Sequence, residues 1–317
     1  MFSLIKWVQG VLGALKRNKG LWFTTLTTLS TFGILVSMYL INSMTSSVAH
    51  DTYMEERRSD INQLDSLLLS RYDSMLNMGS ILSLNPALIR SINSKQDKTV
   101  KQLLKQTTQT INDNVDISPI TIRYYSNEYE VDGSENIDIA KMVIDTKQSV
   151  SGVVVNKDGV RILGMVPIIE NNVSIGALEV TESIHMLRDE FELLGKEFTF
   201  LTSKQQLVFM SLEHKQGMYK KINDEFSVYF HQYDSSFYLN IAKLDFDTLR
   251  TLKYANDSQF YTTYDNVVDL NGRTIGMALI GEDSSNANSF VKITQNMINS
   301  VTTVALGLVI SLILFMF

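Results

Sequence analysis

Two long apolar stretches lie toward the two ends of an otherwise polar chain. Residues 21–41 and residues 301–317 contain no charged side chain, whereas charges recur throughout the sequence between them. A helix rises about 1.5 Å per residue and the hydrocarbon core of a bilayer is about 30 Å thick, so residues 21–41 are long enough to cross it. The second stretch needs a few preceding residues, which gives a span at 298–317. The pattern predicts two transmembrane helices with the polar middle on one side of the membrane.

The charges beside the first span predict its orientation. Lys6, Lys16, Arg17 and Lys19 precede it, and no acidic residue occurs before Asp51. Cationic flanks stay in the cytoplasm. We therefore expect a bacterial inner-membrane protein whose residues 1–20 are cytoplasmic and whose residues 42–297 are periplasmic or extracellular.

A cleaved signal peptide is the alternative interpretation, with small residues at 47–49 as its cleavage site. The first span is longer than the apolar region of a signal peptide, which has roughly 7–15 residues. The second span also favours an anchored protein over a secreted one.

Helical periodicity follows the first span directly, from residue 46 to residue 84. One apolar position recurs every seven residues, occupied by Met54, Ile61, Leu68, Met75 and Leu82. Such a stripe is typical of helix-on-helix packing, so it predicts a homodimer seam. An equally weighted alternative is that the stripe covers the domain's own sheet. Asn85-Pro86 should end the helix, and a second helix is expected at 97–112, giving a helical part at 46–115.

Alternation typical of strands begins at Ile120. Ile120, Ile122 and Tyr124 point to one face, and Arg123 and Tyr125 to the other. A helix at 136–147 and a three-strand meander from 151 to 180, with turns at 156–159 and 171–172, complete a first unit at 116–182. We expect Thr181 to cap a helix over 181–194.

A second unit is expected at 183–283, followed by an exit helix at 284–297. Its predicted strands are 198–201, 226–231 and 237–242, and its last hairpin at 275–280 repeats the pattern of 175–180 at an offset of 100. The predicted fold class is α+β: a long N-terminal helix and two tandem antiparallel sheets, flanked by two transmembrane helices.

Composition narrows the function classes. The chain has no cysteine, which excludes disulfides, thiol nucleophiles and cysteine metal sites. Its net charge is −6, so nucleic acid is not an expected partner. No motif of an enzyme, a metal site or a cofactor site occurs, and we expect neither catalysis nor a cofactor. His185 and Asp189, four apart on a predicted helix, are interpreted as part of a solvated face.

The meander resembles the membrane-distal half of a double-Cache sensor domain, a PAS-like fold. The residues that carry the resemblance are SGV at 151–153, DGVR at 158–161, MVPI at 165–168 and IGALEV at 175–180. Residues 261–280 resemble the membrane-proximal half, and the order of span, long helix, two units and span agrees with the family. The amino-acid-binding subgroup carries a tyrosine, arginine and tryptophan motif that cannot be placed here, because residues 42–297 contain no tryptophan.

The resemblance implies the input part of a bacterial transmembrane receptor, most like a chemotaxis receptor. Receptors of this kind continue past their second span into a signalling region, so we expect residues 1–317 to be the input half alone. Alternatives are the sensor half of a histidine kinase or diguanylate cyclase, or a membrane-anchored adaptor without a ligand. An extracytoplasmic hydrolase ranks far behind these.

Candidate binding residues lie on the face of the first sheet that is predicted to point away from the long helix. Arg123 can hold a ligand carboxylate with two parallel hydrogen bonds, and Tyr125 can close the pocket. By alternation, Arg161, Met165 and Glu179 join them, with Glu179 suited to an ammonium group. The alternative is that Arg123 and Glu179 simply pair with each other. Tyr261, Tyr264 and Asp265 of the second unit are expected to pack in its core rather than line a pocket.

Overall fold

The computed structural model describes residues 19–114, 119–126, 136–211, 218–229, 236–257, 259–284 and 290–316. The chain divides into two compact units. One comprises Met1–Glu55 with Phe290–Phe317, and the other comprises Glu56–Ser289. The long helix α2 (Lys19–Ser83) has residues in both units.

The described residues of the smaller unit form the N-terminal part of α2 and the helix α10 (Phe290–Met316). Large apolar side chains are exposed on both helices, including Phe32, Tyr39, Val301 and Val304. Within the described ranges, no helix has a stretch long and apolar enough to cross a membrane. The spans at 21–41 and 298–317 stay predictions.

In the larger unit, α2 ends at Ser83, close to the predicted break. Asn85 caps the next helix, α3 (Pro86–Asn93), by accepting hydrogen bonds from the backbone N–H groups of Ala87 (2.9 Å) and Leu88 (3.4 Å). Pro86 fits the first helical position because the missing N–H has no partner there. Helix α4 (Asp97–Asn114) matches the helix predicted at 97–112, whereas α3 was not predicted.

The first sheet is antiparallel, with the strand order β1-β4-β3-β2. Its strands are β1 (Thr121–Ser126), β2 (Val150–Asn156), β3 (Gly159–Glu170) and β4 (Val173–Ser183). Both predicted turns are present. Gly159 has a φ of 104°, and Asn171 and Asn172 have φ values of 47° and 63°, which suit a two-residue hairpin.

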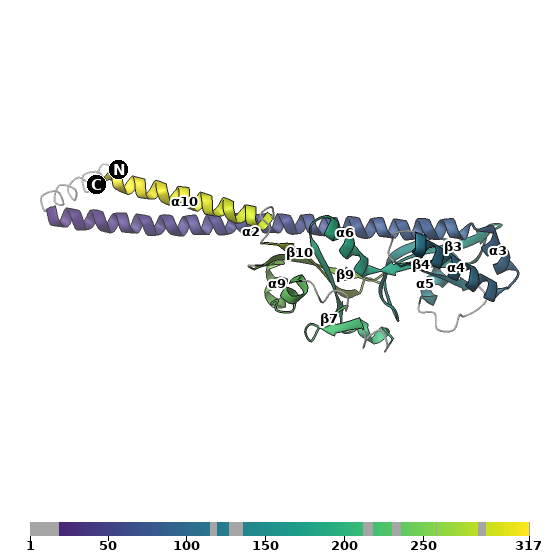
Figure 1. The fold of residues 1–317 in the computed structure, drawn as a ribbon. Helices are drawn as coiled ribbons and strands as arrows, with labels where there is room; N and C mark the ends of the chain where they lie inside the picture. Colours follow the sequence, from purple (N-terminus) through teal and green to yellow (C-terminus); the bar gives the residue numbers. More distant parts are fainter. Residues whose placement is uncertain are drawn as a thin grey trace. The chain divides into compact units, whose positions relative to one another are not determined.

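Helices cover both faces of the first sheet (Figure 1). On one face α2 lies so close that a Cβ atom at Gly164 would be 2.7 Å from the backbone carbon of Met75. On the other face α5 (Ile137–Thr146) packs with Tyr125, Leu163 and Met165 in an apolar cluster. Burial on both faces explains why β3 and β4 read as nearly continuous apolar runs instead of alternating.

The second sheet has the strand order β6-β7-β5-β10-β9-β8, and all of its pairings are antiparallel. Its strands are β5 (Glu197–Ser203), β6 (Tyr219–Lys221), β7 (Phe226–Tyr229), β8 (Tyr254–Asn256), β9 (Phe260–Val268) and β10 (Thr274–Asp283). The short helices of this part are η1 (Ile184–Met186), α6 (Leu187–Leu193), η2 (Gln206–Phe209), α8 (Ser236–Ile241) and α9 (Phe246–Leu252).

Two sequence predictions in this region are wrong. Residues 237–242 were expected as a strand but form most of α8, because helical spacing buries both Phe237 and Ile241 in one cluster. Thr181 was expected to cap a helix over 181–194. It stays in β4, where it pairs with Thr121, and Ser183 caps the turn that precedes α6.

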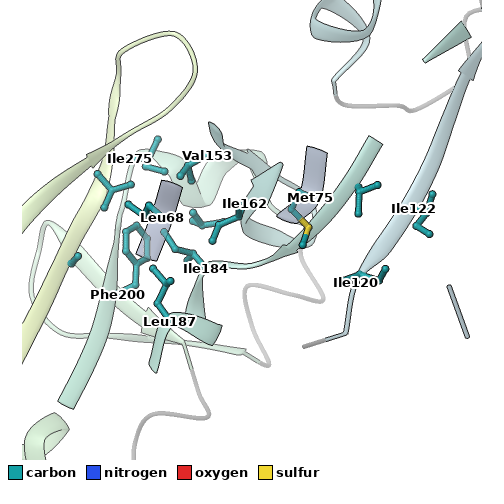
Figure 2. Close-up of a cluster of buried hydrophobic side chains, with 14 of the residues drawn as sticks. Leu68, Met75, Ile120, Ile122, Val153, Ile162, Ile184, Leu187, Phe200 and Ile275 are labelled. Atoms are coloured by element: carbon teal, nitrogen blue, oxygen red, sulfur yellow. The ribbon is translucent and has the colours of Figure 1, made fainter. Parts of the chain in front are cut away.

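One continuous apolar core joins α2 to both sheets. It includes Leu68 and Met75 of α2, Ile162 of the first sheet, and Phe200 and Ile275 of the second (Figure 2). Two of the five heptad positions are therefore buried within the domain, as the alternative interpretation of the stripe expected. The predicted α+β class, with a long N-terminal helix and two antiparallel sheets, is confirmed.

The two sheets also contact each other through backbone. The N–H of Leu270, in the β9–β10 turn, donates to the carbonyl of Val153 in β2 at 3.1 Å. Leu270 lies against Gly152, where an added Cβ would come within 2.4 Å of its side chain. A side chain at position 152 would therefore require the Leu270 side chain to shift.

Candidate ligand-binding site

Three of the five predicted site residues, Arg123, Tyr125 and Glu179, meet in one polar network on the α5 face of the first sheet. Arg123 of β1 and Met165 of β3 are both directly opposite Glu179 of β4 in the strand register. Tyr125, two residues after Arg123, lies on the same face. The alternation that starts at Ile120 is confirmed, because Ile120 and Ile122 belong to the core that includes α2.

Glu179 lies at the centre of a buried polar network. Its carboxylate accepts hydrogen bonds from the hydroxyl of Tyr125 at 2.7 Å and from the side-chain amide of Asn136 at 2.8 Å. The guanidinium of Arg123 lies 3.4 Å from its other oxygen and reaches Asp158 Oδ2 at 2.5 Å with its second nitrogen. Glu179 is 0% exposed, so its charge is balanced by neighbouring side chains in place of water.

The pKa values of this network show which protonation states it favours. Burial raises the pKa of the Tyr125 hydroxyl, and the adjacent charge of Glu179 raises it further, so the phenol stays a donor. Burial alone would lower the pKa of Arg123. The charges of Glu179 and Asp158 outweigh that effect and raise it. Arg123 therefore stays charged and the phenol stays neutral, and Arg123 pairs with Glu179 as the alternative interpretation from sequence proposed.

The other two predicted residues have different surroundings. Met165 is fully buried and packs in the apolar cluster beneath α5. Arg161, near the start of β3, donates through Nη2 to Thr121 Oγ1 at 3.3 Å and to the carbonyl oxygen of Thr181 at 3.1 Å. Burial lowers the pKa of Arg161; the charge of Asp158 opposes this effect, and the positive charge of Arg123 adds to it.

Arg161 lines a cavity of about 490 Å³ at the end of the first sheet. Ligand pockets commonly have volumes of about 300–1,000 Å³. Its lining comes from the segment before β1, from both sheets and from the segment between them: Pro119, Asp158, Val160, Arg161, Ser183, His185, Met186, Arg188, Asp189, Tyr219 and Tyr229. The ring of His185 stacks on that of Tyr229 at 4.6 Å, and Tyr229 meets Tyr219 edge-on at 5.5 Å.

The cavity corrects the interpretation of two sequence positions. His185 and Asp189 were assigned to a solvated helix face. Asp189 is exposed, as expected, but His185 is half-buried, and both residues line the cavity. Tyr219 and Tyr229 had no sequence signal at all, because they reach the cavity from strands of the second sheet.

Asp158 connects the network to the cavity. It lies in the β2–β3 turn, pairs with Arg123, and contributes to the cavity lining. A charged group entering the cavity would therefore compete for the partner of Arg123. Sequence reasoning placed Asp158 in a turn and gave it no role.

A second buried carboxylate lies on the opposite face of β4. Glu182 is 0% exposed, and neither of its oxygens has a hydrogen-bond partner among the described residues. The guanidinium of Arg71, in α2, comes within 3.7 Å and also pairs with Glu190 of α6. Burial raises the pKa of Glu182, although the charge of Arg71 opposes this.

In the second sheet, Tyr261 and Tyr264 are 1% and 5% exposed and pack in the interior, as expected. Asp60 of α2 is also buried there, where it accepts a 2.8 Å hydrogen bond from Thr263 and pairs with Lys196. Over the described ranges, no cluster of three histidine, aspartate or glutamate residues is placed to hold a metal ion.

Comparisons with known proteins give structural matches only. No protein-family model matches the chain, and no curated protein matches its sequence. Solved structures that resemble it include sensor or ligand-binding domains of histidine kinases and chemoreceptors and a domain of a GGDEF family protein.

Three of these structures illustrate the range. The sensor domain of the V. cholerae histidine kinase DctB is 13% identical over 72% of this chain and 96% of its own, with a TM-score of 0.38. A domain of a sensory box/GGDEF family protein from Vibrio parahaemolyticus is 12% identical over 75% and 100%, with a TM-score of 0.42. The ligand-binding domain of the Pseudomonas aeruginosa amino acid chemoreceptor PctC, in complex with GABA, is 11% identical over 70% and 93%, with a TM-score of 0.31.

Proposed function

We propose that residues 1–317 are the ligand-sensing input of a bacterial inner-membrane receptor, with residues 42–297 outside the cytoplasm. In this proposal a small solute binds at the unit built on the first sheet. The observation that carries it is the shared position of Asp158, which belongs both to the buried network of Glu179 and to the cavity. A sensor needs such a connection between a cavity and groups inside the fold.

The geometry supports a route from the cavity to the helices. A ligand that draws Asp158 away from Arg123 leaves Glu179 with an altered charge balance beneath α5. Because α2 packs on the opposite face of the same sheet, a shift of the strands changes its packing as well. Ligand can drive such a shift only by binding the two arrangements with different affinity.

The full proposal includes a homodimer, no catalytic activity and an output in chemotaxis. The dimer rests on the upper part of the heptad stripe, where Met54 and Ile61 are outside the apolar core that holds Leu68 and Met75. The output rests on the family resemblance alone. Fusion of residues 1–317 to a chemotaxis signalling region, followed by tracking of swimming cells in solute gradients, tests that part.

A thermal-shift screen of the full chain in detergent micelles tests binding directly. The panel holds amino acids, carboxylates, amines and purines, since a ligand raises the apparent melting temperature by mass action. We expect a hit that Arg123→Ala weakens. Arg90→Ala, at an exposed position of α3, is the control and should leave the shift unchanged. No hit across the panel would favour the ligand-free adaptor.

A further inference from the structure

The cavity at the end of the first sheet contains a cation without a counter-ion. Among the described residues, no carboxylate lies within 4.0 Å of the Arg161 guanidinium, and both of its hydrogen bonds are made by Nη2 to uncharged oxygens. A guanidinium carries five N–H donors. The donors on Nε and Nη1 therefore have no described acceptor.

The acidic side chains nearest the cavity do not fill this role. Asp158 is on the lining but is already paired with Arg123 at 2.5 Å. Asp189 is exposed. Asp158, Glu179 and Glu182 act on Arg161 only as charges beyond 4.0 Å, and burial, the largest effect, lowers its pKa. A half-buried guanidinium in such surroundings is stabilised by an anion that comes from outside.

The rest of the lining suits a small organic anion. Arg188 adds a second guanidinium, and the ring faces of His185, Tyr229 and Tyr219 supply apolar surface. Guanidinium groups bind carboxylates through two parallel hydrogen bonds. The aromatic rings can cover the carbon skeleton attached to such a group.

We infer that the cavity binds a small carboxylate, held by Arg161 of the first sheet and covered by Tyr219 and Tyr229 of the second. This inference rests on the proposed function, since it names the ligand class for the same cavity. It adds that the ligand contacts both sheets at once, so occupancy is expected to resist their separation. Neither the family resemblance nor the residues found from sequence placed the second sheet in the site.

Matched ligands test the inference on the unmodified full chain in detergent micelles. The probes are acetate, succinate and glutarate, each compared with its uncharged amide, plus butylamine and agmatine as cations. We expect at least one carboxylate to raise the melting temperature in a concentration-dependent way, and its amide to do so far less. Binding of an amide or an amine in preference to every carboxylate would overturn the inference.

Variants then locate the site. Loss of charge-assisted hydrogen bonds costs about 10- to 100-fold in affinity. Arg161→Gln should therefore reduce the affinity for the carboxylate by that factor. Arg161→Lys, which keeps the charge, should weaken it less. Tyr229→Ala, which removes the covering ring, should reduce affinity, whereas Tyr229→Phe, which keeps the ring, and Arg90→Gln on α3 should change it little. Carboxylate binding that is unchanged in folded Arg161→Gln protein would overturn the assignment.

The outcomes separate this inference from the proposed function. An uncharged or cationic solute that binds, with an affinity reduced by Asp158→Asn but not by Arg161→Gln, would support the proposed sensor function. The same result would show that the inferred carboxylate ligand class is wrong. If no compound binds in either the probe set or the wider screen, both are wrong.

Discussion

The hydroxyl of Tyr125 donates a 2.7 Å hydrogen bond to the fully buried carboxylate of Glu179, across neighbouring strands of the first sheet. This contact lies under α5, where water cannot replace either partner. Both residues were found from strand alternation alone, because β1 and β4 are each long enough to fix which side chains share a face.

Glu179→Ala is expected to destabilise the larger unit by about 3–5 kcal/mol, since it leaves Arg123, Tyr125 and Asn136 without their common partner. Denaturant unfolding of the full chain in micelles, followed by circular dichroism, measures the change. Glu192→Ala, at an exposed position of α6, should stay within about 0.5 kcal/mol of wild type. An equally small effect for Glu179→Ala would show that the network adds nothing to stability.

Gly164→Ala should be among the most disruptive single-methyl changes in the chain. Its Cβ would lie 2.7 Å from the backbone of Met75, so α2 must move away from the sheet, at a cost of about 1–3 kcal/mol or more. Gly79→Ala is the matched control from the helix side. Its Cβ meets side chains but no backbone, Val166 at 3.1 Å and Val180 at 3.5 Å, and alanine favours a helix over glycine by about 1 kcal/mol. Similar melting temperatures for the two variants would contradict the close contact.

Glu182→Gln should change how stability depends on pH. Because burial raises the pKa of Glu182 above its ordinary value of 4.5, the folded state keeps this proton at pH values where the unfolded chain has lost it. The unfolded state then binds fewer protons, so this group lowers stability as pH rises above about 4.5. The glutamine variant does not titrate and is expected to gain stability relative to wild type over that interval.

Urea unfolding at a series of pH values from 4 to 8 measures this difference, with Glu192→Gln as a surface control. If the stability of wild type instead rises relative to that of Glu182→Gln as pH rises, the charges of Arg71 and Arg161 outweigh burial in setting the pKa of Glu182.

Disulfide crosslinking at two positions seven residues apart tests the predicted homodimer. The chain has no native cysteine, so any crosslink reports only the introduced residue. Ile61→Cys should form a crosslink between two chains in membranes under mild oxidation. Leu68→Cys should not, because Leu68 is 8% exposed and packs in the core of its own chain. If neither Ile61→Cys nor Met54→Cys forms a crosslink between chains, the predicted homodimer seam is wrong.

Much of the first unit could be predicted from sequence because its signals are local. The turns carry asparagine or glycine at positive φ, and alternation along β1 separates Ile122 from Arg123. Asn85 and Pro86 likewise end α2 through the backbone restrictions of those two residues. Such features need only a few neighbouring residues to be recognised.

The cavity could not be predicted because it depends on tertiary contacts. Tyr219 and Tyr229 come from short strands, and the ring of Tyr229 reaches His185 only after the second sheet has packed. The same limit explains the wrong prediction of a strand at residues 237–242, because a short apolar run is compatible with a buried helix as well as with a strand. Thr181 reads as a cap, yet its pairing with Thr121 keeps it in the sheet.

The continuous core and the Leu270–Val153 hydrogen bond have a practical consequence for dividing the chain. A fragment cut between the sheets would expose Phe200 and Ile275, and would separate Leu270 from its acceptor. Fragments and fusions that keep Glu56–Ser289 intact, with junctions near its two ends, should keep both sheets folded.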